Sequence, residues 1–107
     1  MAFEVRLTAQ AMTDLEDIHA YIAERDGLAR ADRTLQALQD RIAGLALLPE
    51  RGNVTRELAA LGVTAFREIH YKPYRVIYRT IGATVFVDAV LDGRRDMRSL
   101  LQHRLLR

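Results

Sequence analysis

The chain has 107 residues, half of them hydrophobic and 28% charged, which predicts a single soluble globular domain spanning residues 1–107. It contains no cysteine, which excludes disulfides, thiolate metal sites and a cysteine nucleophile and suits the cytoplasm. No apolar run approaches the roughly 20 residues that a membrane helix needs, and the start of the chain does not resemble a signal peptide.

Charge is distributed unevenly along the chain. The formal net charge is +2, because 15 arginines and a single lysine, Lys72, outnumber 14 acidic residues. Residues 1–53 carry a net charge of −3, whereas residues 54–107 carry +5. A high ratio of arginine to lysine is also typical of GC-rich genomes, but that bias does not explain the asymmetry. The asymmetry indicates an anionic partner for the second half.

The first half of the chain predicts a strand followed by two helices. Residues 3–8 alternate between apolar and polar side chains, as a half-buried strand does. Thr8 is a good N-cap for a first helix that ends near Gly27. A second helix is expected over residues 28–45, where apolar residues recur every three or four positions, and Pro49 marks its end. The two helices should pack as an antiparallel hairpin.

The second half predicts mainly strands. After a short helical turn at residues 56–61, aromatic and β-branched residues favour strands at 66–71, 74–80 and 83–91, joined by hairpin turns. Helical spacing returns at residues 96–106. The resulting order is β-α-α-β-β-β with a C-terminal helix. We therefore expect a two-layer α+β fold, in which the helical hairpin covers one face of a four-stranded, mostly antiparallel sheet and the other face meets solvent or a ligand.

Arginines gather on the predicted strands and on the loop after the last one. In the strand 74–80, Arg75 and Arg79 point to the face opposite Tyr74 and Tyr78. Together with nearby arginines they form a predicted six-arginine patch: Arg67, Arg75, Arg79, Arg94, Arg95 and Arg98. Guanidinium groups beside tyrosines are typical of surfaces that bind phosphates. The alternative is a solvated surface on which the arginines pair with nearby acids, namely Glu68, Asp88, Asp92 and Asp96.

The sequence lacks the usual catalytic motifs. Ser99 is the only serine, and the three histidines do not have the spacing of a zinc site. No glycine-rich phosphate-binding loop is present. We therefore expect no metal and no cofactor. Among the histidines, His70 is the candidate for a general base, although a packed or solvent-facing role is more common for a lone histidine on a strand.

The chain resembles the RelE/ParE superfamily, the toxins of bacterial type II toxin–antitoxin modules, also known as plasmid-stabilisation proteins. The resemblance runs over nearly the whole chain and rests on several short segments: Leu48-Pro49 with Gly52, Arg67, Tyr74-Arg75-Val76-Ile77-Tyr78, and Arg94-Arg95-Asp96. It implies the same β-α-α-β-β-β fold, a cognate antitoxin as partner and a hetero-oligomer with that antitoxin.

The superfamily implies two targets. RelE-like members cut mRNA in the ribosome, where the RNA's own 2′-hydroxyl is the nucleophile, so the protein supplies cations and an acid/base group. In this chain those groups would be Arg67, His70, Arg75 and Arg95. ParE-like members inhibit DNA gyrase by binding it.

The segment that follows the last predicted strand, from residue 96 onward, distinguishes the two kinds of toxin. Such nucleases commonly have a tyrosine or histidine early in the tail, where this chain has Met97-Arg98-Ser99-Leu100-Leu101. The resemblance therefore favours a gyrase inhibitor, with a ribosome-dependent mRNA endonuclease as the alternative. A decayed toxin that retains only antitoxin binding is a third hypothesis.

The resemblance also implies contact residues. The antitoxin's C-terminal segment is expected to wrap the helical hairpin and the sheet and to bring acidic side chains to the arginines. The residues expected to contact the target or the antitoxin are Arg67, Tyr74, Arg75, Tyr78, Arg79, Arg94, Arg95 and Arg98.

Overall fold

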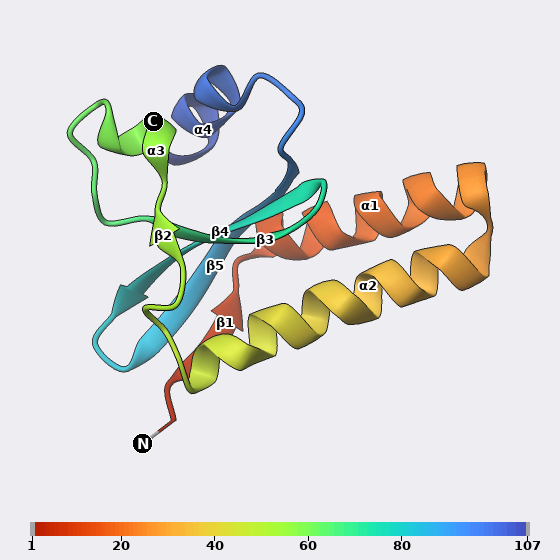
Figure 1. Cartoon of the computed structure of the whole chain (residues 1–107), viewed down its shortest axis with the longest axis horizontal. Coiled ribbons are helices and arrows are strands. Elements are labelled where there is room, and N and C mark those ends of the chain that lie inside the picture. Colours follow the sequence, from red (N-terminus) through yellow and green to blue (C-terminus); the bar gives the residue numbers. More distant parts are fainter. Residues whose placement is uncertain (1, 107) are drawn as a thin grey trace.

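Four α-helices lie against a mixed sheet of five strands in the computed structural model, which describes residues 2–106 (Figure 1). The helices are α1 (Ala9–Asp26), α2 (Leu28–Ala43), α3 (Arg56–Ala59) and α4 (Met97–Leu105), and a 3₁₀ turn at Gly44–Ala46 follows α2. The strands are β1 (Glu4–Leu7), β2 (Asn53–Val54), β3 (Arg67–Tyr71), β4 (Tyr74–Ile81) and β5 (Thr84–Asp92). The α+β prediction is confirmed. None of the helices in residues 2–106 is long and apolar enough to cross a membrane.

The sheet has one strand more than the sequence predicted. Its strand order is β1-β5-β4-β3-β2, with β1 parallel to β5 and every other neighbouring pair antiparallel. The additional strand is β2, in which Asn53 and Val54 pair with Glu68 and Arg67 of β3. A strand of two residues is too short to show an alternating pattern, which is why the four-strand prediction is wrong.

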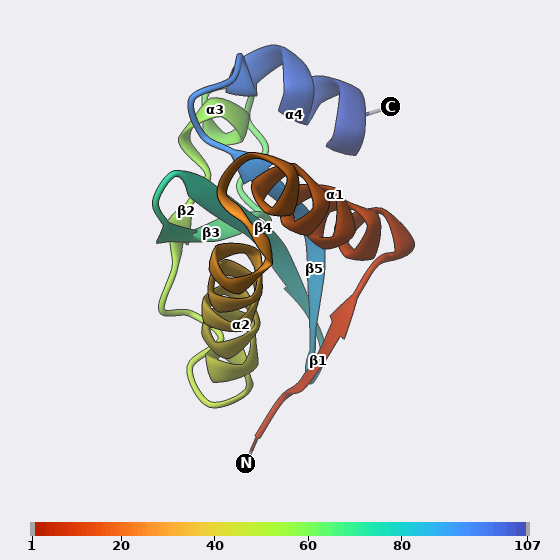
Figure 2. The same cartoon turned by 90° about the vertical axis from the view of Figure 1, so that its right-hand side faces the viewer.

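The helical hairpin covers one face of the sheet, as predicted (Figure 2). Thr8 caps α1, because its Oγ1 accepts a hydrogen bond from Ala11 N at 3.1 Å. Gly27 joins the helices with a φ of 94°, which L side chains rarely adopt. The main core between the hairpin and the sheet includes Leu15, Ile22, Leu38, Ile42, Val76, Tyr78, Val85 and Val87. Each fully buried aliphatic side chain in this core contributes about 1.5–3 kcal/mol.

The opposite face of the sheet is also covered, so the two-layer prediction is wrong at this point. There α3 and α4 lie next to each other (Figure 1) and enclose a second core. Its buried residues are Leu58, Ile77, Ala89, Leu91, Met97 and Leu101. Because α3 has only four residues and contributes mainly Leu58, the sequence shows no apolar stripe that would indicate a third layer.

Ion pairing and capping hold α4 in place. Asp96 caps its start by accepting a hydrogen bond from Ser99 N at 3.3 Å. Near its end, Arg104 donates to both carboxylate oxygens of Asp14 on α1, at 3.1 and 2.9 Å. Asp14 also accepts a hydrogen bond from the backbone N–H of Val90 at 2.9 Å, beyond the end of the β1–β5 pairing. Asp14 therefore joins α1, β5 and α4.

Candidate functional site

Two of the candidate site residues, His70 and Arg75, are brought together with the nearby acid Glu68 by the pairing of β3 and β4. His70 lies directly opposite Arg75, and Glu68 lies opposite Ile77. Since cross-strand partners share a face and alternate residues return to it, Glu68, His70 and Arg75 all lie on the face that α3 and α4 cover. The short helix α3 then adds Glu57 to this group.

Arg75 is almost fully enclosed by two carboxylates. It donates to Glu57 through Nη1 and Nη2 at 2.8 and 2.6 Å, and to Glu68 through Nε and Nη2 at 3.0 and 2.5 Å. These bonds occupy four of the five N–H groups that a guanidinium has. The side chain is only 13% exposed. Gly93 lies against its stem, where a Cβ would stand 2.8 Å from Arg75 Cδ.

His70 completes the group, which we call the Arg75 cluster: Glu57, Glu68, His70 and Arg75. The ring Nε2 of His70 lies 2.5 Å from Oε2 of Glu68, and the histidine side chain is 48% exposed. Glu68 is therefore shared between a guanidinium and an imidazole. A carboxylate that orients an imidazole is the usual arrangement of a general base, so the cluster has one feature of a catalytic site.

The electrostatics of the Arg75 cluster oppose phosphate binding. Hydrogen bonds from Arg75 are the main reason that the pKa of Glu57 is lowered from 4.5 to about 2, and the same bonds raise the pKa of Arg75. At neutral pH one positive guanidinium therefore faces two carboxylates, Glu57 and Glu68. The guanidinium is therefore already neutralised by carboxylates and offers no free positive charge to an incoming phosphate.

Arg67 and the two tyrosines of β4 lie on the other face and have structural contacts. Tyr78 is completely buried, and its hydroxyl donates to Pro49 O at 2.7 Å and accepts from Gly52 N at 3.1 Å. Arg67 donates to Gly52 O at 2.7 Å. Tyr74 is buried in the main core, and this burial raises its pKa and that of Tyr78. Arg67 and Tyr78 thus fasten the segment after α2 to the sheet.

Two more arginines of the predicted six-arginine patch are paired with nearby acids. Arg79 Nε donates to the buried Asp88 at 3.0 Å, and burial raises the pKa of that carboxyl. Arg94 donates to both oxygens of Asp92 at 3.0 and 2.7 Å, which lowers the pKa of Asp92. For these two arginines, the alternative of pairing with nearby acids is confirmed.

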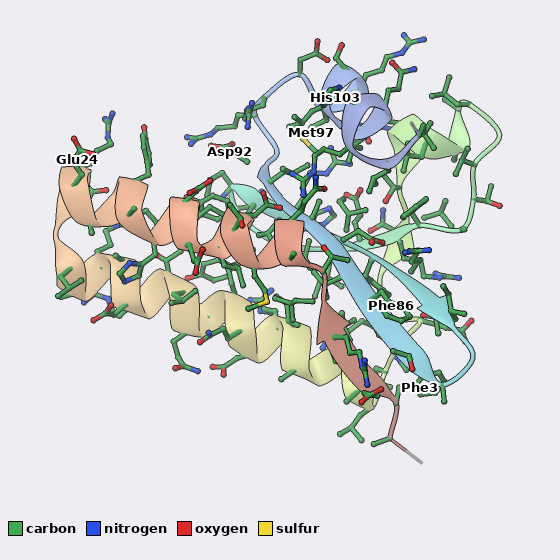
Figure 3. All side chains as sticks on the ribbon, turned by 180° about the vertical axis from the view of Figure 1, so that it is seen from behind. Phe3, Glu24, Phe86, Asp92, Met97 and His103 are labelled. Atoms are coloured by element: carbon green, nitrogen blue, oxygen red, sulfur yellow. The ribbon has the colours of Figure 1, made fainter. Side chains whose placement is uncertain are left out.

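The predicted patch is therefore divided among several surfaces. Arg67 lies on one face of the sheet, and Arg75 and Arg79 lie on the other. At the junction of β5 and α4, Arg95 and Arg98 are exposed, and neither forms an ion pair within residues 2–106. Figure 3 shows this end of the molecule from behind, with Asp92 at the end of β5 and Met97 at the start of α4.

Glu57 is the residue that sequence reasoning missed. The acids expected to pair with arginines are on the strands and the final loop. Glu57 instead contacts Arg75 from a four-residue helix, 18 positions away in the chain. Nothing in the local pattern indicates that contact. Among residues 2–106, no three acidic or histidine side chains gather in an arrangement that could hold a metal ion.

Comparison with known proteins agrees with this architecture. The family described as "ParE toxin of type II toxin-antitoxin system, parDE" matches residues 5–97. A structure of the chromosomal ParDE system of P. aeruginosa is similar with a TM-score of 0.70 and 16% identity, over 83% of this chain and 94% of that one. No curated protein matches the chain significantly.

Two structures from the RelE side of the superfamily are also similar. The RelBE2 toxin–antitoxin complex of Mycobacterium tuberculosis has a TM-score of 0.62 and 24% identity, over 86% of this chain and 92% of that one. A mutant of the E. coli toxin RelE in the free state has a TM-score of 0.62 and 16% identity, over 94% of this chain and 93% of that one. Since the family match spans most of the residues, the chain belongs to the ParE toxin family of type II toxin–antitoxin systems, within the RelE/ParE superfamily.

Proposed function

We propose that this toxin inhibits DNA gyrase by binding it and that a cognate antitoxin neutralises it. The observation that carries the proposal is the state of Arg75. Its guanidinium is bound by Glu57 and Glu68 and is nearly inaccessible, so the arginine that a RelE-like nuclease would direct at RNA is committed to the fold.

The start of α4 supports the same choice. Cleavage of RNA through its own 2′-hydroxyl needs a proton acceptor, a proton donor and a cation at the phosphate. The first residues of α4 are Met97, Arg98 and Ser99, of which Met97 is buried in the second core. None of these side chains exchanges protons near neutral pH. The family match to ParE toxins favours the same reading.

The exposed end of the molecule offers a surface for the target. Arg94, Arg95 and Arg98 are exposed where β5 leads into α4. A shallow depression of about 380 Å³ lies beside them, lined by Arg95, Asp96, Ser99, Leu100 and His103. We assign target contact to this surface, with Arg95 and Arg98 as the main contributors, because neither has an acidic partner on the described chain.

A different surface suits the antitoxin. A groove of about 370 Å³ runs beside α1 and α2 and is lined by Leu7, Met12, Leu15 and Leu35 as well as polar residues. Met12 is 55% exposed there. Exposed apolar side chains in a groove fit the apolar face of a peptide or helix. The similar P. aeruginosa and M. tuberculosis structures are of toxin–antitoxin systems, which supports a cognate antitoxin as the occupant.

Purified toxin and gyrase test the proposal. We expect the toxin to reduce ATP-dependent supercoiling of relaxed plasmid and to increase cleaved DNA, and we expect the purified antitoxin to reverse both effects. Expression without the antitoxin should arrest growth, which separates an active toxin from one that retains only antitoxin binding. Unimpaired supercoiling at a large molar excess of toxin over gyrase would count against the proposal.

A ribosome-dependent mRNA endonuclease is the second candidate. The pairing of Glu68 with His70 favours it, because the imidazole is half exposed and oriented by a carboxylate. Of the expected cations, Arg95 would be available to RNA, because Arg75 is bound by Glu57 and Glu68 and Arg67 by Gly52 O. Primer extension on mRNA from expressing cells should reveal cleavage within codons at the ribosome, and loss of that cleavage in His70→Gln would support the nuclease over the gyrase inhibitor.

A further inference from the structure

A second basic surface lies on the hairpin side of the sheet, between the tip of the helical hairpin and the turn that joins β3 to β4 (Figure 2). It is a groove of about 350 Å³. We call it the hairpin groove, and its principal residues are Tyr21, Arg25, Asp26, Arg30, Lys72 and Arg94.

The cations of the hairpin groove come from four segments of the chain. Arg25 is at the end of α1, Arg30 is at the start of α2, Lys72 is in the β3–β4 turn and Arg94 follows β5. Only one acidic residue, Asp26, lines the groove with them. Arg25 and Arg30 lie in the half of the sequence whose net charge is negative. The net charges of the two halves therefore do not predict this cluster of cations.

Internal ion pairs neutralise one of the four cations, Arg94, and leave the other three largely free. Arg30 and Asp26 approach only to 4.0 Å, and both are more than half exposed, so that pair contributes little. Arg94 binds Asp92 outside the groove lining. Within residues 2–106, neither Arg25 nor Lys72 takes part in an ion pair. The Arg75 cluster shows the opposite condition, with two carboxylates around one guanidinium.

Aromatic rings orient the guanidinium groups in and beside the groove. The guanidinium of Arg25 lies 5.3 Å from the centre of the Tyr21 ring. At the flank of the groove, Arg41 lies 5.3 Å from the Tyr71 ring centre and donates to His70 O at 2.7 Å. A stacked guanidinium keeps N–H groups at its edge for an anion while losing fewer conformations on binding.

We propose that the hairpin groove binds backbone phosphates of DNA. Peptide interfaces have an apolar centre depleted of charged residues, whereas four cations line this groove and the guanidinium of Arg25 covers its exposed ring, Tyr21. Phosphate contacts need only cations and hydrogen-bond donors along a groove. The apolar groove beside Met12 fits a peptide better, which leaves the hairpin groove to a polyanion.

The choice of DNA rests on the proposed function, because gyrase holds DNA while it acts. A toxin with this groove contacts the DNA segment at the gyrase surface as well as the enzyme. Arg94 belongs to both the groove and the target surface, whereas Arg95 and Arg98 lie outside the groove, so enzyme and DNA are contacted by adjoining parts of the molecule.

Binding of a fluorescein-labelled 20-base-pair duplex by the purified toxin, followed by anisotropy without gyrase, tests the groove. The groove variant is Arg25→Gln with Lys72→Gln, one cation from each wall. Its control is Arg6→Gln with Arg56→Gln, which removes the same charge from exposed positions outside the groove. We expect the groove variant to weaken binding about tenfold or more and the control to weaken it less than about threefold. The slope of log Kd against log salt should fall by about 2 in the groove variant only.

Three results would overturn the proposal: no binding of the duplex by the wild-type toxin at low salt, equal loss in the two variants, or tighter binding of single-stranded RNA or of polyglutamate of equal charge. Because gyrase is absent, failure here leaves the proposed target unaffected. If the toxin binds duplex DNA through the groove but does not inhibit gyrase, the groove proposal stands and gyrase is rejected as the target.

Discussion

Replacement of Glu57 by glutamine is the sharpest test of the Arg75 cluster. The pKa of Glu57 is lowered from 4.5 to about 2 by hydrogen bonds from Arg75. A fall of that size corresponds to about 3 kcal/mol of stabilisation of the folded state when the carboxylate is ionised. Because the folded pKa lies below the unfolded one, this stabilisation is complete above about pH 5 and is lost as the pH falls toward 2. At pH 3 only about 1 kcal/mol remains.

Urea unfolding followed by far-UV circular dichroism gives the measurement. Glu57→Gln should lower the free energy of unfolding by about 3 kcal/mol near pH 7 and by about 1 kcal/mol near pH 3. The matched control is Glu24→Gln on the exposed side of α1, for which we expect a change within about 0.5 kcal/mol at both pH values. A difference between wild type and Glu57→Gln that does not shrink on acidification would refute the reasoning, as would a cost near pH 7 no larger than that of the control.

Three further substitutions test other contacts. Tyr78→Phe leaves the buried Gly52 N and the partly buried Pro49 O without their partner, so the free energy of unfolding should fall by about 1–3 kcal/mol; an unchanged urea midpoint would contradict the assigned contacts. Asp14→Asn removes the charge that Arg104 binds and should cost about 2 kcal/mol, with amide exchange rising first in α4; exchange that rises equally throughout the sheet would argue against the role of this ion pair. Arg95→Glu should raise the concentration needed to inhibit gyrase about tenfold while leaving the melting temperature within a degree or two, and undiminished inhibition would remove Arg95 from the target surface.

The hairpin and the central strands were predictable because their signals are local. Thr8 and Gly27 mark the start of α1 and the link to α2, and the alternation in β4 correctly separated Arg75 from Tyr74 and Tyr78. Each of these inferences uses residues that are close in sequence, where periodicity and capping chemistry operate.

The third layer and the enclosure of Arg75 were not predictable in this way. Both depend on α3, a helix of four residues whose Leu58 enters the second core and whose Glu57 binds Arg75. Tertiary packing decides which arginine of a strand pairs with a carboxylate, and the periodicity of the sequence does not predict that pairing. The same holds for the hairpin groove, whose cations Arg25 and Lys72 are distant in the chain.

We propose that the toxin acts on gyrase and does not cut RNA. A gyrase supercoiling assay on relaxed plasmid, with purified wild-type toxin titrated against a fixed amount of enzyme, tests it most directly. We expect a dose-dependent loss of supercoiling with accumulation of cleaved DNA, both reversed by the antitoxin. Full supercoiling activity at every toxin concentration that arrests growth in cells would contradict it.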